Sequence, residues 1–170
     1  MVKKDTKVAV LGAGAMGCLF GGLLAEKGLD VVLIDVWKEH IDAINSKGLK
    51  MDGHGGDRFI KIKATTDPST LKPVDAIIIM CKATALEKAL NNSKNIIGKN
   101  TMLMSFQNGI GHEAIMQKIA GKDKVLGGTT TQASNILGPG HIKNHAALPS
   151  WIGEYEGGMS ERVKDIAETF

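Results

Sequence analysis

Residues 8–17, which read VAVLGAGAMG, are the stretch that most clearly indicates the fold. The four apolar residues predict a buried strand, and the glycine-rich turn behind them leads into a helix. Gly12 permits the tight turn, Gly14 lets backbone amides approach a pyrophosphate, and Gly17 lets the helix lie close to the sheet. The pyrophosphate would sit on free N–H groups at the positive end of the helix dipole. The stretch therefore predicts a dinucleotide site formed by Gly12, Ala13, Gly14, Ala15, Met16 and Gly17.

An acidic residue strengthens this prediction. Asp35 ends the next predicted strand, where a carboxylate can hydrogen-bond the ribose hydroxyls of a dinucleotide. The same charge repels a 2′-phosphate about 4 Å away by roughly 1–4 kcal/mol, which is about tenfold to thousandfold discrimination against NADP(H). Asp35 therefore favours NAD(H), although Lys38 is near enough in sequence to soften the penalty. The alternative role for Asp35 is that of a solvated residue capping the following helix.

Length and composition are those of a soluble globular protein, with 170 residues, 43% of them hydrophobic and 23% charged. This length suits one domain, or one domain and the start of another. The net charge is only +3 and the lysines are scattered, so we expect no nucleic-acid partner. We expect no membrane partner either, because no apolar stretch approaches a spanning length. Cys18 and Cys81 lie in apolar patterns, which predicts buried free thiols and a cytoplasmic protein.

Short apolar runs alternate with amphipathic stretches, which is typical of an α/β, Rossmann-type parallel sheet with helices on both faces. The predicted strands are Lys7–Leu11, Asp30–Asp35, Val74–Cys81, Thr101–Phe106 and Val125–Thr131. The predicted helices are Met16–Lys27, Lys38–Lys47, Ala85–Ile97 and Glu113–Ala120. Leu49–Lys63 carries glycines between two extended pieces, which indicates a hairpin or an edge excursion.

The pattern changes toward the C-terminus. Asn135–Ile142 reads as two antiparallel strands around Gly-Pro-Gly, and Pro149–Gly153 adds one more, so we predict an antiparallel extension of the sheet. Ser160–Phe170 begins a helix that has a cap but no stop signal. We therefore expect residues 1–158 to form a dinucleotide-binding domain. Residues 159–170 are expected to start a linker or helix leading to a helical C-terminal domain that is missing from this sequence.

Polar residues follow two neighbouring predicted strands at equivalent ends. Lys82 comes directly after Val74–Cys81, and Gln-Asn-Gly at 107–109 follows Thr101–Phe106. Ligands bind beyond the carboxyl ends of the strands in an open parallel sheet, so the two loops are candidates for one shared site. The alternatives are a lysine that snorkels at a strand end and an ordinary Asn-Gly turn.

The five histidines do not predict a metal site. His141 and His145 are four residues apart, but the glycine and proline around them argue against a helix that presents both. No Ser/His/Asp arrangement with an elbow motif is present in the sequence.

Four motifs together resemble a known family. In order, residues 12–17, Cys-Lys-Ala at 81–83, Gln-Asn-Gly at 107–109 and Gly-Thr-Thr-Thr at 128–131 are similar to the N-terminal domain of ketopantoate reductase (2-dehydropantoate 2-reductase). The resemblance implies reduction of a branched 2-oxo acid by hydride from a nicotinamide cofactor, usually NADP(H), on the way to pantothenate and coenzyme A. It also implies that Lys82 contacts the cofactor, that Asn108 touches both cofactor and substrate, and that Ala133 lines the nicotinamide side.

The chain departs from that family in three places. Many relatives carry an arginine after the second strand for the NADP 2′-phosphate, whereas residues 34–37 here read Ile-Asp-Val-Trp. Gln132 stands where a number of relatives have histidine, so we assign no role to it. The family's general acid is a lysine two positions after a tryptophan in the C-terminal domain, and neither Trp37 nor Trp151 has that lysine. We expect no catalytic residue in this chain, and no activity from it alone.

Two other functions stay open. The fold also serves D-2-hydroxyacid dehydrogenases acting on other branched 2-oxo acids, and non-catalytic dinucleotide-sensing modules that act through a partner. A helical continuation with an inward lysine favours an enzyme, whereas a stop codon after Phe170 favours the module. The expected small-molecule partner is a 2-oxo acid, and a homodimer of the complete protein stays open.

Overall fold

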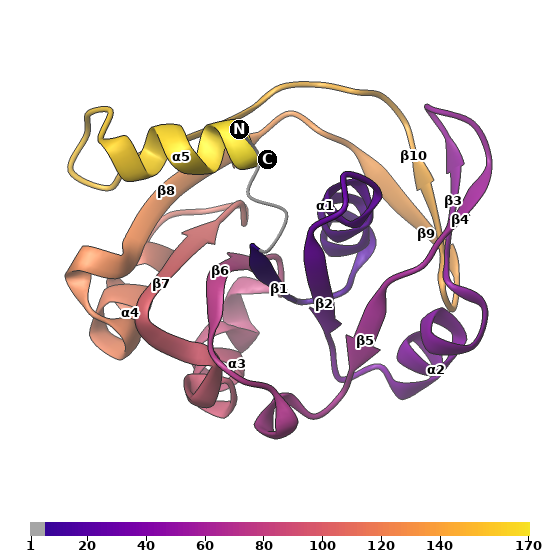
Figure 1. The fold of residues 1–170 in the computed structure, drawn as a ribbon, viewed down its shortest axis with the longest axis horizontal. Coiled ribbons are helices and arrows are strands. Elements are labelled where there is room, and N and C mark those ends of the chain that lie inside the picture. Colours follow the sequence, from indigo (N-terminus) through magenta and orange to yellow (C-terminus); the bar gives the residue numbers. More distant parts are fainter. Residues whose placement is uncertain (1–5) are drawn as a thin grey trace.

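The computed structural model describes residues 6–170, and its main body is a seven-stranded sheet (Figure 1). Residues 1–5, the start of the predicted domain, lie outside the described residues. The edge strand β11 is antiparallel to its neighbour, and the other strands of this sheet run parallel. In spatial order the strands are β11 (Ser150–Glu154), β8 (Val125–Thr130), β7 (Ile97–Ser105), β6 (Val74–Ile79), β1 (Lys7–Leu11), β2 (Asp30–Ile34) and β5 (Lys63–Thr65). The predicted Rossmann-type α/β class is confirmed.

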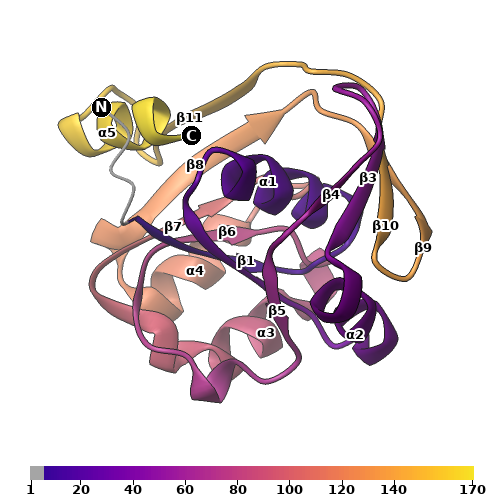
Figure 2. The ribbon, with the colours of Figure 1, turned by 45° about the vertical axis from the view of Figure 1, so that its right-hand side comes forward.

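Helices cover both faces of this sheet (Figure 2). They are α1 (Ala15–Glu26), α2 (Lys38–Lys47), α3 (Leu86–Asn92), α4 (His112–Ala120) and α5 (Glu161–Thr169), with 3-10 turns at Pro68–Thr70, Ala83–Ala85, Lys94–Ile96 and Lys122–Lys124. Alternate residues of β1 explain the two layers. Val8 and Val10 pack on the side of α1, while Ala9 and Leu11 pack on the side of α3 and α4. A strand buried on both faces reads as a continuous apolar run, as this one does.

A second sheet of four strands lies on the far side of α1, so this helix is enclosed between two sheets (Figures 1 and 2). Its order is β4 (Arg58–Ile60), β3 (Leu49–Gly53), β10 (His141–Asn144) and β9 (Ser134–Gly138). The sequence of α1, AMGCLFGGLLAE, is apolar around most of the helix, which suits burial on both sides. Gly22 permits close packing, because a Cβ there would meet side chains of the second sheet at 2.9–3.1 Å.

The antiparallel strands predicted near the C-terminus are confirmed, but they divide between the two sheets. Only β11 extends the main sheet, by pairing antiparallel with β8. The two strands predicted in Asn135–Ile142 form the hairpin β9–β10, but β10 pairs parallel with β3 in the second sheet. The predicted hairpin in Leu49–Lys63 is β3 with β4, whereas Lys63 already begins β5, which is parallel to β2. Local sequence patterns identify the hairpin, but they do not show which other strand the hairpin pairs with, because that depends on the tertiary arrangement.

The predicted helix Ala85–Ile97 is wrong in its second half. α3 ends at Asn92, and Ile97 already begins β7. The run of Asn91, Asn92 and Ser93 explains the early end, because short polar side chains compete for backbone hydrogen bonds. The side-chain amide of Asn91, for example, donates to the carbonyl oxygen of Glu87 at 2.8 Å.

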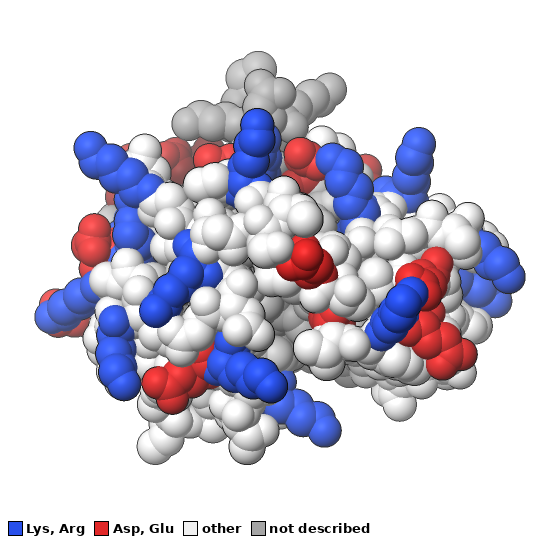
Figure 3. Space-filling model, turned by 90° about the horizontal axis from the view of Figure 1, so that it is seen from below, with Lys and Arg blue, Asp and Glu red and all other residues white. Residues whose placement is uncertain are grey.

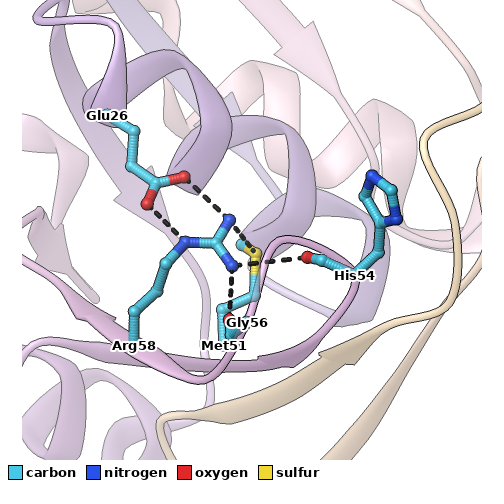
Figure 4. Close-up of polar contacts among 5 residues, drawn as sticks. All are labelled: Glu26, Met51, His54, Gly56 and Arg58. Carbon is cyan, nitrogen blue, oxygen red and sulfur yellow. Dashed lines mark hydrogen bonds and ion pairs between the residues drawn. The ribbon is translucent and has the colours of Figure 1, made fainter.

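Arg58 fastens the second sheet to α1 (Figure 4). Its guanidinium forms a two-point ion pair with Glu26, with Nε–Oε1 at 2.5 Å and Nη2–Oε2 at 2.9 Å. Nη1 also donates to the carbonyl oxygen of Gly56 at 2.8 Å, which holds the turn between β3 and β4. The hydrogen bond to Glu26 raises the pKa of Arg58 above its ordinary value. The pair is partly buried, because the two side chains are only 23% and 33% exposed.

We expect Arg58→Met to lower the free energy of unfolding by about 1–2 kcal/mol, because it removes both this pair and the bond to the turn. Lys63→Met is the matched control. It breaks the ion pair between Lys63 and Asp30, whose side chains are 75% and 47% exposed, respectively. Such exposed pairs contribute only about 0–0.5 kcal/mol. Urea unfolding of the two variants measures the difference, and equal losses would contradict the anchoring role of Arg58.

Glu154 fastens α5 to the edge strand β11. Its carboxylate accepts hydrogen bonds from Arg162 Nε at 2.7 Å and Nη2 at 2.5 Å, and from the hydroxyl of Ser160. Ser160 also caps α5 as predicted, because its hydroxyl accepts from Val163 N–H at 3.3 Å. Hydrogen bonding from Arg162 lowers the pKa of Glu154 to about 2.

This pairing predicts an acid-sensitive contribution to stability. The pKa of Glu154 is lower in the fold than its ordinary 4.5, so the unfolded chain binds more protons between these values and stability falls as the pH drops through that window. We expect Glu154→Gln to cost about 1–2 kcal/mol at about pH 7, and the cost to shrink at about pH 3. Thermal unfolding at both pH values measures this. Glu161→Gln, at an 85% exposed carboxylate, is the control, and a pH-independent cost at Glu154 would refute the idea.

Candidate functional site

The carboxyl ends of the parallel strands form the edge where the predicted site residues lie. β1 has β2 on one side and β6 on the other, so the strand order reverses there, and ligands bind at such a switch point. Backbone hydrogen bonds hold these ends together, from Gly12 N–H to Ile34 O at 2.8 Å and from Cys81 N–H to Leu11 O at 2.9 Å.

The strand order brings the predicted site residues to one edge. Following β8, β7, β6, β1 and β2 in space, the segments just past their carboxyl ends carry Ala133, Asn108, Lys82, the glycine turn and Asp35. Residues that are more than a hundred positions apart in the sequence therefore share one edge of the sheet. Their roles in binding stay predictions.

The glycine turn has the geometry that its sequence predicts. Gly12 has φ +103°, and a Cβ there would overlap the backbone of Cys81. A Cβ on Gly17 would overlap the carbonyl oxygen of Gly12, so this glycine lets α1 start directly against the turn. A Cβ on Gly14, by contrast, would meet no atom within 4 Å. The fold itself requires Gly12 and Gly17, whereas Gly14 borders open space.

The N-terminus of α1 faces that space without a side-chain cap. Gly14 is its N-cap residue, and the first turn contains no acidic residue. The first hydrogen bond within the helix runs from Cys18 N–H to Gly14 O at 2.9 Å, and the amides before it have no acceptor within the helix. The helix dipole adds positive potential at this end. The arrangement suits a phosphate or pyrophosphate.

Asp35 has a structural role of which the sequence suggests only the part at the start of the following helix. Its Oδ2 accepts a hydrogen bond from Ala13 N–H at 2.7 Å, and its Oδ1 accepts one from Trp37 N–H at 3.0 Å. The carboxylate thus connects the glycine turn to the start of α2. A carboxylate has about four acceptor positions, so these bonds leave room for ribose hydroxyls as well.

The cation closest to Asp35 in the sequence binds another carboxylate. Lys38 Nζ pairs with Asp42 Oδ2 at 2.5 Å, one helical turn further along α2, and both side chains are exposed. The structure therefore shows Lys38 neutralising Asp42 and not Asp35.

A hollow of about 130 Å³ lies beside Asp35 at the ends of β1, β2 and β6. Leu11, Ile34 and Val36 give it an apolar lining. Ser93 also lines it, and its hydroxyl is buried and has no hydrogen-bond partner among residues 6–170. The apolar lining suits a flat ring, which packs against such side chains. No motif in the sequence signals Ser93.

A larger hollow, of about 680 Å³, lies at the opposite, amino ends of β2 and β5. Its lining includes Asp30, Lys47, Phe59 and Lys63, and none of the predicted site residues. Size alone therefore does not mark the site, because the chemistry of a switch point lies at the carboxyl ends.

Lys82 and Asn108 both lie exposed at their strand ends. The loop of Asn108 is held from two sides. His112 Nε2 hydrogen-bonds to Asn108 O at 2.9 Å, and the side-chain amide of Gln107 donates to the carbonyl oxygen of Cys81. Gln107 thus joins the ends of β6 and β7, and His112 joins the loop to the start of α4, which are positioning roles that the sequence pattern does not reveal.

Ala133 follows β8, and its carbonyl oxygen accepts a hydrogen bond from His145 N–H at 3.1 Å. The neighbouring Gln132, to which the sequence assigns no role, donates to Leu148 O at 2.6 Å. Its Oε1 is buried without a partner in the described part of the chain. Gln132 and Phe106 line a second apolar hollow, of about 290 Å³, between α1, β11 and α5.

Charge and cysteine chemistry point away from other kinds of site. Basic and acidic side chains are interspersed on the face shown in Figure 3 rather than gathered in a stripe. Within residues 6–170, no three His, Cys, Asp or Glu side chains group in a way that could hold a metal ion. Over the same range, no helix combines the length and apolarity needed to cross a membrane. Burial raises the pKa of Cys18 to about 12 and of Cys81 to about 11, so neither free thiol is a ready nucleophile.

The fold and the strand-end geometry define a Rossmann-like domain of the NAD(P)-binding class. Within this class the chain belongs to the ketopantoate reductase family, because residues 8–157 match the family described as Ketopantoate reductase PanE/ApbA. It is 40% identical over 164 residues to the 2-dehydropantoate 2-reductase of Pyrococcus horikoshii, and 32% identical to that of Lactococcus lactis. These alignments cover 96% and 95% of this chain but 52% and 53% of the relatives. The chain thus spans about half the length of these relatives.

Solved structures share this fold. The ternary structure of D-mandelate dehydrogenase with NADH and anilino(oxo)acetate has a TM-score of 0.90 at 32% identity, covering 96% of this chain and 53% of that one. A PanE/ApbA family ketopantoate reductase from Ralstonia eutropha has a TM-score of 0.87 at 29% identity, covering 96% of this chain and 53% of that one. The family resemblance seen in the sequence is thereby confirmed, and it extends to a dehydrogenase that binds NADH.

Proposed function

We propose that this chain is the cofactor-binding part of a 2-dehydropantoate 2-reductase, which reduces ketopantoate to pantoate with hydride from a nicotinamide dinucleotide. The uncapped N-terminus of α1 beside Gly14 is the observation that carries the proposal. Asp35, Lys82 and Asn108 at neighbouring strand ends complete the site. Support for the substrate comes from the relatives that bear this name at 40% and 32% identity.

The adenosine half of the dinucleotide fits the residues around the glycine turn. Amides at Ala15 and Met16 bind the pyrophosphate at the α1 N-terminus. Asp35 accepts hydrogen bonds from the ribose hydroxyls, and the hollow lined by Ser93 takes the adenine ring.

The nicotinamide half lies toward β7 and β8. Lys82 contacts the cofactor, Asn108 touches both the cofactor and the substrate, and Ala133 borders the nicotinamide, as the family resemblance implies. When bound, the nicotinamide supplies the hydride for the substrate carbonyl. The general acid is placed outside these 170 residues. The division into residues 1–158 and 159–170, the cytoplasmic location and a homodimer stay predictions.

One observation favours a second candidate. D-mandelate dehydrogenase has the same fold at 32% identity, so a reductase of other 2-oxo acids that gives D-2-hydroxy acids is also consistent. Sequencing the gene past codon 170 is the first test, since a stop codon would favour a dinucleotide-sensing module. If the gene continues, the full-length protein can be assayed with ketopantoate and with phenylglyoxylate, the 2-oxo acid that corresponds to mandelate. The ratio of the two kcat/KM values separates the two enzymes. A preference for phenylglyoxylate would overturn the first proposal.

We expect NADH to bind at least as tightly as NADPH. Asp35 repels a 2′-phosphate, and Lys38 is paired with Asp42, so the full discrimination would be about tenfold to thousandfold. Competitive titration of the two reduced cofactors measures the ratio. Lys38→Met is the control and should leave the ratio unchanged. If NADPH binds more tightly than NADH and this preference is lost in Lys38→Met, the prediction is wrong. Lys38 would then contact the 2′-phosphate, and its attraction would exceed the repulsion by Asp35.

A further inference from the structure

A series of hydrogen bonds behind the glycine turn runs through two buried side chains, His40 and Cys18, that make none of the proposed cofactor contacts. It begins at Gly140, between β9 and β10, whose N–H donates to His40 Nδ1 at 3.0 Å. His40 Nε2 lies 3.2 Å from Cys18 Sγ, and this sulfur lies 3.2 Å from Ala13 O. Ala13 N–H in turn donates to Asp35. Two buried side chains therefore connect the second sheet to the glycine turn.

The backbone donor at Gly140 decides the protonation of His40. A backbone N–H can only donate, so Nδ1 carries no proton and the neutral ring carries its proton on Nε2. Nε2–H then donates to the sulfur of Cys18, and the thiol hydrogen is left for Ala13 O. Donation thus runs in one direction, from the second sheet to the glycine turn.

Burial keeps both side chains neutral. His40 and Cys18 are 0% exposed, and the Trp37 ring stacks on His40 with centroids 4.8 Å apart and planes inclined by 16°. Burial lowers the pKa of His40, against opposing effects of Asp35 and of a hydrogen bond to the backbone of Ala13, and burial raises the pKa of Cys18. A protonated imidazole would place Nδ1–H against the N–H of Gly140, and two donors cannot bond to each other.

We propose that His40 and Cys18 are positioning residues that hold the Ala13–Gly14 peptide for cofactor binding. The inference rests on the proposed function, because it takes the glycine turn as the dinucleotide site. The carbonyl of Ala13 and the N–H of Gly14 belong to one planar trans peptide, so they point in opposite directions. Holding the oxygen on the inner side therefore directs Gly14 N–H outward. The β9–β10 hairpin, which directly follows Ala133, is coupled to the same peptide.

Substitutions in the 170-residue chain test each link. We expect Cys18→Ala to raise the Kd of NADH about three- to tenfold, as for one lost hydrogen bond, and Cys18→Ser to restore most of the affinity because its hydroxyl can donate to Ala13 O. His40→Asn should act like Cys18→Ala, since its amide oxygen still accepts from Gly140 but its side chain is too short to reach Cys18. Ile44→Val, buried on the same helix as His40, is the matched control and should lower stability without changing Kd.

Nuclear magnetic resonance of the cofactor-free chain gives a signature that mere destabilisation would not produce. The ring nitrogens of His40 should show the Nε2–H tautomer, and the Gly14 amide signal should shift in Cys18→Ala and return in Cys18→Ser. An Nδ1–H tautomer, or unchanged Gly14 signals together with unchanged Kd values, would overturn the inference. A wild-type chain that binds no NADH would instead overturn the proposed function, and the Gly14 signal alone would then decide whether the turn is held.

Discussion

Gly14→Val is expected to raise the Kd of NADH at least about a hundredfold while the chain stays folded. A Cβ on Gly14 meets no protein atom within 4 Å, and the φ of −68° is open to any residue. The branched side chain would nevertheless fill the space beside the α1 N-terminus that a pyrophosphate must enter. Each charge-assisted hydrogen bond lost there costs about 1.5–3 kcal/mol, so two of them account for the expected effect.

Two further glycines calibrate this result. Gly138→Val is the matched control, because a Cβ in β9 at that position also meets nothing within 4 Å, and both folding and affinity should be retained. Gly17→Val should fail to fold, because its Cβ overlaps the carbonyl oxygen of Gly12. Circular dichroism and calorimetry with NADH measure the two properties. If the Gly14→Val chain folds and its affinity for NADH is unchanged, the glycine turn is not the cofactor site.

The 170-residue chain is expected to bind NADH yet to reduce ketopantoate at a negligible rate. It spans about half the length of its curated relatives, and we place the general acid and part of the substrate site in the other half. A positioned general acid contributes about 10²–10⁴ in rate. An oriented substrate site contributes up to about 7–11 kcal/mol more.

A steady-state assay with ketopantoate and either reduced cofactor measures this rate. The same preparation must bind NADH, so that inactivity is not confused with misfolding. Turnover of about one per second or more, which is ordinary for an enzyme, would prove the prediction wrong. It would require a catalytic acid within the chain, and Lys82→Met would then be the first variant to examine.

The glycine turn could be predicted residue by residue because its requirements are mostly local. Gly17 is needed because its Cβ would overlap the carbonyl oxygen of Gly12 in the same turn, whereas Gly12 also keeps the turn clear of the Cys81 backbone at the end of β6. The apolar run before them is buried on both faces, as strands of a parallel sheet are. Lys82 and Asn108 could be placed at strand ends because each directly follows a recognisable apolar strand. The same reasoning failed at Ala85–Ile97, where polar residues after Asn92 ended the helix earlier than its apolar spacing indicates.

Other parts of the site could not be predicted, because no local pattern marks them. Gln107 and His112 have ordinary sequence neighbourhoods, and their roles come from the backbone atoms that they approach in space. Asp35 was predicted to bind ribose from its position, but its bond to Ala13 appears only once β1 and β2 lie side by side.

By itself, the sequence determined the Rossmann-type sheet, the glycine turn and the edge on which the site residues lie. Apolar periodicity and glycine spacing are patterns among residues close together in the sequence, so they can be recognised without the structure. Only the tertiary structure decided that β10 pairs with β3, that Lys38 binds Asp42, and that His40 connects the second sheet to Cys18. Each of these depends on polar or backbone contacts, each contributing about 1 kcal/mol or less, whose formation is set by geometry that periodicity does not encode.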